Sequence, residues 1–104
     1  MKILEKEITS KGFKYTQLLR EDRLAIYEQS KKGHDVKKYE VIIIDSHDGY
    51  EIGGQHVIAA EVYPSSTSWG IKGFTMETYD DALNKIKSLK KKQAAKAAKD
   101  SKQK

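Results

Sequence analysis

Alternating hydrophobic and polar residues predict three strands in the first half of the chain. The first begins at Phe13, with Tyr15 and Leu19 expected on the same face of a half-buried strand. A charged turn separates it from a second strand at 24–29. The β-branched run at 39–44 predicts a central strand with both faces covered.

The pattern is less regular in the next thirty or so residues. We interpret 45–54 as a long, turn-rich connection and 57–62 as a fourth strand. A last short strand is expected at 69–76, where glycines permit a bend or bulge. Residues 1–11 fit either a short helix or an edge strand.

Helical periodicity then replaces alternation. Thr78 with Asp81 three residues later has the form of a capping box, with Asp in place of Glu. The apolar residues that recur at helical spacing are Tyr79, Ala82, Leu83, Ile86 and Leu89. The sequence therefore predicts an α+β domain: an antiparallel sheet of four to five strands followed by one C-terminal helix and a basic tail.

Length and composition bound the class of protein. The 104 residues suit one domain, which we place at 1–89, followed by a lysine- and alanine-rich flexible or helical tail at 90–104. There is no cysteine, so disulfides and thiolate sites are excluded and a reducing compartment is favoured. The N-terminus lacks the apolar core of a signal peptide and no apolar run could span a bilayer, so we expect a cytoplasmic protein without a membrane partner.

Positive charge is concentrated at the C-terminal end. Residues 90–104 hold seven lysines against one aspartate, a net +6, whereas 1–89 hold 13 basic and 14 acidic residues. The tail is either a basic arm that contacts phosphates or a solubilising segment. A second basic cluster flanks a hairpin loop around His34. The candidate nucleic-acid-binding residues are Lys31, Lys32, Lys37, Lys38, Lys90, Lys91, Lys92, Lys96 and Lys99.

Catalytic and metal-binding patterns are not found. His47 and His56 match no metal-ligand spacing, and the serines near Ser65 lack a nucleophile elbow. The glycines at 49–54 are not followed by the Lys-Ser/Thr of a phosphate loop. We therefore expect a non-enzymatic protein without a metal or cofactor.

Two aromatic residues are candidates for contacting a partner. Trp69, the single tryptophan, either stacks on a base or partner or covers the end of the core, and the second interpretation is preferred. Tyr27 is more often a core residue in such a position. A sheet face that carries Tyr15 and Tyr27 beside Lys14 would nevertheless suit single-stranded nucleic acid.

Part of the chain resembles small uncharacterised proteins of bacteriophages and mobile elements. The residues that carry the resemblance are Ala25-Ile26-Tyr27-Glu28, Tyr39-Glu40-Val41, Pro64-Ser65-Ser66, Trp69-Gly70, Gly73-Phe74-Thr75 and Ala82. The order of strands and helix is also similar to the transcription coactivator fold, which binds single-stranded DNA as a dimer. That similarity is one of topology, and topology alone does not assign function.

Two hypotheses follow. The chain is an accessory protein that binds DNA or RNA through its basic tail and hairpin, with an edge strand or the helix available for a homodimer. Alternatively, it is a protein-interaction module, such as a phage-encoded factor that binds a host protein.

Overall fold

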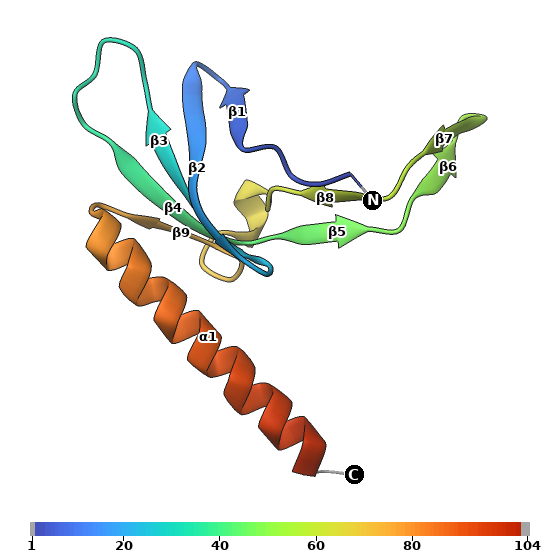
Figure 1. Cartoon of the computed structure of the whole chain (residues 1–104). Coiled ribbons are helices and arrows are strands. Elements are labelled where there is room, and N and C mark those ends of the chain that lie inside the picture. Colours follow the sequence, from blue (N-terminus) through green and yellow to red (C-terminus); the bar gives the residue numbers. More distant parts are fainter. Residues whose placement is uncertain (1, 103–104) are drawn as a thin grey trace.

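A five-stranded antiparallel sheet and one long helix form the body of the molecule (Figure 1). The computed structural model describes residues 2–102, without the side chains of residues 66 and 95–102. The sheet has the order β1-β2-β3-β4-β9. Its strands are β1 (Glu7–Ser10), β2 (Phe13–Glu21), β3 (Leu24–Ser30), β4 (Lys38–Ile43) and β9 (Gly73–Met76), and the helix is α1 (Tyr79–Lys102). The predicted fold class is confirmed, and the ambiguous N-terminal segment supplies the edge strand β1.

Both faces of the sheet bury apolar side chains, because neighbouring residues of β3 and β4 point to opposite sides. Leu24, Ile26 and Val41 face α1. The opposite side, which we call the far face, buries a second cluster of Ala25, Tyr27, Ile42 and Ile44. The prediction that the β-branched strand is covered on both faces is confirmed, since Val41 and Ile42 are both fully buried.

A β-bulge in β2 changes which face its residues occupy. Gln17 pairs with Tyr27, but the next pair along the strands is Leu19 with Ile26, so one residue of β2 is unpaired. Tyr15 consequently packs on the far face, whereas Leu19 packs beside α1. The expectation that Tyr15 and Leu19 share a face was wrong because an extra residue inverts the alternation.

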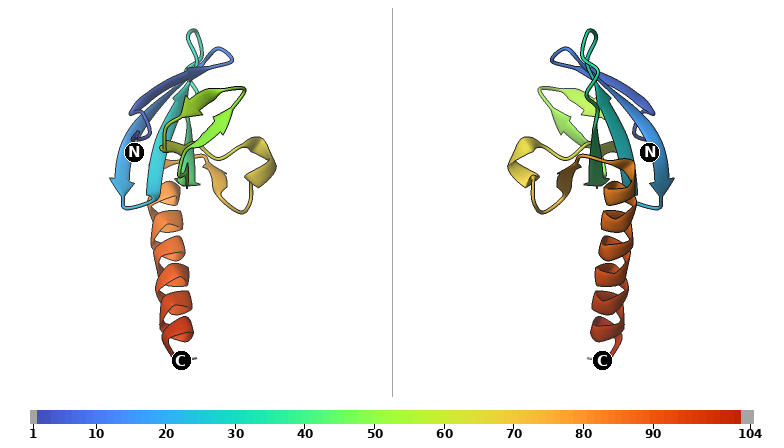
Figure 2. Two further views of the ribbon diagram at one scale, coloured as in Figure 1. Left: turned by 90° about the vertical axis from the view of Figure 1, so that its right-hand side faces the viewer. Right: turned by 90° about the vertical axis from the view of Figure 1, so that its left-hand side faces the viewer.

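The helix begins where its cap was predicted. Thr78 Oγ1 accepts a hydrogen bond from the Asp81 N–H at 3.1 Å, which satisfies one of the free donors of the first turn. Ala82, Ile86 and Leu89 are buried against the sheet. Beyond Leu89 the backbone stays helical through Lys102, and this extension projects away from the sheet (Figures 1 and 2).

Residues 45–62 form a two-tiered hairpin, which we call the arm (Figure 1). Its strands are β5 (Asp45–His47), β6 (Tyr50–Ile52), β7 (Gln55–Val57) and β8 (Ala60–Val62), paired β5 with β8 and β6 with β7. The expected continuous strand at 57–62 is therefore two short strands outside the main sheet, and β9 occupies the place beside β4. Gly49 is needed at the break, because a Cβ there would lie 2.9 Å from the Val57 carbonyl oxygen.

Candidate nucleic-acid interface

Four aromatic rings form a continuous row on the far face. Phe13 and Tyr15 come from β2, Tyr63 follows β8, and Trp69 follows the 3-10 helix η1 (Ser66–Ser68). Successive ring centroids are 6.5 Å apart for Phe13 and Tyr15, 5.9 Å for Tyr15 and Tyr63, and 6.4 Å for Tyr63 and Trp69. We call these residues the aromatic row. Two of the four lie about fifty residues beyond the others in the sequence, so only the fold brings the row together.

Trp69 holds its place through contacts with β9. Its Nε1–H donates to Thr75 Oγ1 at 3.0 Å, and its ring lies directly over Gly73. A Cβ on Gly73 would come within 2.2 Å of that ring. Trp69 packs against the far-face core yet is only half-buried. It therefore covers the end of the core, as preferred from the sequence, and still presents surface to solvent.

Tyr27 cannot contact a partner as the sequence suggested. Its side chain is 0% exposed. The hydroxyl donates to the Glu5 carbonyl oxygen at 2.7 Å and accepts from Gln17 Nε2 at 3.0 Å. Burial raises the pKa of this hydroxyl, with opposition from the Gln17 hydrogen bond. Tyr27 is a core residue because β3 is the middle strand of the sheet and both of its faces are covered.

A pocket of about 400 Å³ opens beside the aromatic row. The residues that line it include Lys11, Tyr15, Glu40, Tyr63, Pro64 and Trp69. Glu40 lies on β4 and is only 8% exposed. Its Oε1 accepts a short hydrogen bond from the Tyr63 hydroxyl. Burial raises the pKa of the Glu40 carboxyl, and the Tyr63 hydrogen bond opposes that rise. We call this cavity the far-face pocket.

Three of the predicted hairpin lysines, Lys31, Lys32 and Lys37, lie in the loop between β3 and β4, and Lys38 is the first residue of β4. Lys31 Nζ is 5.4 Å from the centroid of the Phe13 ring, a cation–π contact. Lys37 pairs with Glu28 at 3.2 Å and Lys38 with Glu77 at 3.0 Å.

Two of the hairpin lysines remain available for an external anion. Among the side chains that the structure describes, Lys31 and Lys32 have no carboxylate oxygen within 4.0 Å, unlike Lys37 and Lys38. A second cavity of about 270 Å³ lies here, between Phe13, Lys31 and His34. The hairpin thus offers an aromatic ring flanked by unpaired positive charge.

The lysines of the helical extension lie at the other end of the molecule. The β3–β4 loop and the C-terminal end of α1 point in opposite directions (Figure 2). Lys90 forms an ion pair with Glu21 at the end of β2, while Lys91 and Lys92 are exposed. The side chains of Lys96 and Lys99 lie outside the described part of the structure. The fold therefore separates the two predicted basic clusters.

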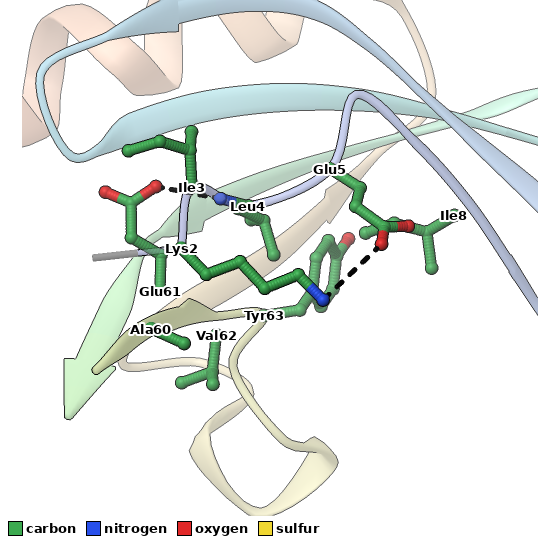
Figure 3. Close-up of a pocket in the computed structure, with 9 residues that line it drawn as sticks. All are labelled: Lys2, Ile3, Leu4, Glu5, Ile8, Ala60, Glu61, Val62 and Tyr63. Carbon is green, nitrogen blue, oxygen red and sulfur yellow. Dashed lines mark hydrogen bonds and ion pairs between the residues drawn. The ribbon is translucent and has the colours of Figure 1, made fainter. Parts of the chain in front are cut away.

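A further cavity, of about 390 Å³, lies between the N-terminal segment and β8 (Figure 3). Glu61 stands at its wall and accepts three hydrogen bonds: Arg20 donates to its two oxygens at 2.7 and 2.6 Å, and the Leu4 N–H donates at 2.9 Å. The Arg20 hydrogen bond, then that of Leu4, lowers the pKa of Glu61 to about 2. A carboxylate held in this way is a structural clasp, because it ties the N-terminal segment at Leu4 and the strand β2 at Arg20 to β8.

The histidines and serines considered from the sequence lie apart from one another. His47 Nδ1 accepts the Gly49 N–H at 3.3 Å, whereas His56 is exposed on β7. Ser65 and Thr67 hydrogen-bond to each other at 2.7 Å. Among the side chains that the structure describes, no three from His, Asp or Glu come together as a metal-binding group. None of the helical residues within 2–102 forms a segment long and apolar enough to cross a membrane.

Neither Glu40 nor the far-face pocket was expected from the sequence. One signal was available, since Glu40 is the single charged residue in the apolar run 39–44. Comparison with known proteins finds no matching family model, curated protein or solved structure.

Proposed function

We propose that the chain is a non-enzymatic accessory protein that binds single-stranded nucleic acid across its far face. The observation that carries the proposal is the adjacency of the aromatic row to unpaired lysines at the hairpin. Base–aromatic stacking contributes about 1–3 kcal/mol per base in such proteins, and every base offers a π-face. Lys31 and Lys32 would supply phosphate contacts at the Phe13 end of the row.

The lysines of the helical extension have a different role in this proposal. They lie away from the far face, so they would hold a second stretch of the strand by charge alone. The body of the protein is nearly neutral, with 13 basic and 14 acidic residues in 1–89. The two lysine clusters would therefore supply the phosphate contacts, and binding should be strongly salt-dependent because each contact releases counterions. A homodimer, through the edge strand β1 or through α1, would double the number of phosphate contacts.

A salt titration of oligonucleotide binding tests the proposal on the full-length chain. Single-stranded and double-stranded DNA and RNA are compared for the wild type and for two sets of substitutions, Lys31→Gln with Lys32→Gln, and Lys91→Gln with Lys92→Gln. For single strands the slope of log K against log salt concentration should fall by about 0.7 for each contacting lysine removed. Lys87→Gln, an exposed helix position outside both clusters, is the matched control.

The outcome of that titration also separates the two basic clusters. If the salt slope falls only in the variant with Lys91→Gln and Lys92→Gln, the helical extension makes generic phosphate contacts and the far face does not take part. A preference for single strands that depends on Lys31 and Lys32 would support recognition by the far face. Absence of binding to any nucleic acid at about 0.15 M salt would overturn the proposal.

The arm favours a second candidate function, a protein-interaction module. Its large apolar side chains are unusually open to solvent: Ile52 is 65% exposed, Ile58 60% and Tyr50 51%. Exposed apolar groups on a projecting hairpin are typical of surfaces that bind another protein. The resemblance to phage proteins would make a host protein the partner. This function predicts a stable complex in a pull-down that Ile52→Glu abolishes, together with weak or absent nucleic-acid binding.

A further inference from the structure

Glu40 is a buried carboxylate without a cationic partner. It is 8% exposed, and among the described residues no Lys, Arg or His nitrogen lies within 4.0 Å of it, in contrast to Glu28, Glu61 and Glu77. Its neighbours in the sheet are Tyr27 and Thr75. Placing a carboxylate in such a site is unfavourable unless hydrogen bonds satisfy it.

Only one of the two carboxylate oxygens is satisfied within the fold. Oε1 accepts the Tyr63 hydroxyl, and Oε2 accepts no hydrogen bond from the described residues. Oε2 is also not sealed from solvent, because no described side-chain nitrogen or oxygen is both sealed and unpaired. Since Glu40 lines the far-face pocket, Oε2 is an acceptor that a ligand in that pocket can reach.

The walls and rim of the pocket suit a flat ligand with a negative group at one end. Tyr63 and Trp69 present rings inclined by only 20°, and Tyr15 stands next to Tyr63. Lys11, in the turn between β1 and β2, also lines the pocket. The volume of about 400 Å³ is within the range of small-molecule sites, roughly 300–1,000 Å³. A simple organic cation would also suit aromatic rings and a carboxylate, but Lys11 would repel it.

We propose that the far-face pocket is a base-reading subsite, which takes one unpaired nucleobase that carries an exocyclic amino group. The base stacks on Trp69, its amino group donates to Glu40 Oε2, and its phosphate lies toward Lys11. Adenine, cytosine and guanine offer such an amino donor. Uracil and thymine present carbonyl oxygens at their Watson–Crick edge on either side of N3–H, and these oxygens repel a carboxylate. The subsite rests on the proposed function and adds base preference to it.

Fluorescence of Trp69, the only tryptophan, reports occupancy of the pocket directly. The probes are cytidine and uridine 5′-monophosphate, a pair that differs at C4 by an amino group against a carbonyl oxygen. Quenching by the cytidine nucleotide should occur at about 10-fold lower concentration than by the uridine nucleotide, within the range that a single base contact provides. Equal quenching by both nucleotides would overturn the subsite. Quenching by tetramethylammonium and by neither nucleotide would also overturn it, because the pocket would then bind an organic cation.

Substitution of Glu40 gives a sharper test, because the chemistry of the site can be inverted. In Glu40→Gln the amide oxygen can still accept the Tyr63 hydroxyl, which directs the amide N–H₂ into the pocket. The preference should then reverse toward uridine. Glu77 is an exposed carboxylate that directly follows β9, and Glu77→Gln should leave the preference unchanged. Lys11→Gln should weaken the binding of both nucleotides equally. A preference that survives Glu40→Gln in a folded protein, as judged by circular dichroism, would overturn the assignment.

Oligonucleotide binding separates failure of the subsite from failure of the proposed function. If oligo-dC and oligo-dT bind equally tightly with a salt slope that depends on Lys31 and Lys32, the proposed function stands and the subsite is overturned. If neither oligonucleotide binds and neither nucleotide quenches Trp69, both are overturned.

Discussion

Replacement of Gly73 by alanine tests whether the Trp69 ring is fixed by its contact with β9. An added Cβ would meet three atoms of the ring at 2.2, 2.3 and 2.7 Å, distances at which one of the two groups must move. Gly73 is not among the glycines with positive φ, so the substitution introduces this contact without backbone strain. We expect the ring to be displaced, with loss of its hydrogen bond to Thr75 and of its stacking on Tyr63.

The magnitude follows from two opposing effects. Overpacking at a tightly filled site costs about 1–3 kcal/mol of the free energy of unfolding. Alanine by itself is more favourable than glycine in a strand by roughly 0.5–1 kcal/mol. Gly73→Ala should therefore destabilise the wild type, yet it should be neutral or stabilising in a Trp69→Leu background, where the obstructing ring is absent. The propensity of alanine is the same in both backgrounds and cancels in the comparison, so the coupling between the two positions equals the overpacking cost, about 1–3 kcal/mol.

Urea denaturation followed by far-UV circular dichroism measures all four proteins of this double-mutant cycle, including those without tryptophan. In the wild-type background, the fluorescence of Trp69 should also shift to longer wavelength when Gly73→Ala displaces the ring into solvent. Additive free energies, with a coupling below about 0.5 kcal/mol, would refute the contact between Trp69 and Gly73 as the reason for the glycine.

Two further predictions concern the clasp and the helix cap. Arg20→Met should lower the free energy of unfolding by about 1.5–3 kcal/mol, because it removes charge-assisted hydrogen bonds from Glu61. The pKa of Glu61 is about 2 in the folded protein and near 4.5 in the unfolded chain. The ionised carboxylate therefore contributes fully to the free energy of unfolding above pH 4.5, and this contribution is lost as the pH falls toward 2. Urea titrations from pH 6 to pH 2 should therefore show a weaker acid dependence in Arg20→Met, and an unchanged dependence would contradict the clasp. Thr78→Ala should cost about 1 kcal/mol through loss of the N-cap, measured by thermal unfolding, while Thr78→Ser should retain most of the stability.

The elements with strong local periodicity could be predicted from the sequence. The alternation in β3 and β4, the apolar stripe of α1 and the cap at Thr78 each depend on residues close together in the chain. Their period alone indicates which side chains share a face, so the fold class could be predicted, although the place of β9 beside β4 could not. The alternation misled in β2, because the bulge between Gln17 and Leu19 moves the following side chains to the opposite face of the sheet. The composition of the strand gives no sign of this bulge.

The candidate site depended on contacts between distant segments. Phe13 and Tyr15 join Tyr63 and Trp69 only because the loop after β8 folds back over the far face, where Gly73 leaves room for the indole. The sequence by itself determined the central strands, the helix and the positions of the lysines, since periodicity and charge are local properties. Tertiary structure alone decided that Tyr27 is buried, that the two lysine clusters lie apart, and that Glu40 opens into an aromatic pocket, because register and loop closure bring together residues whose proximity no local pattern encodes.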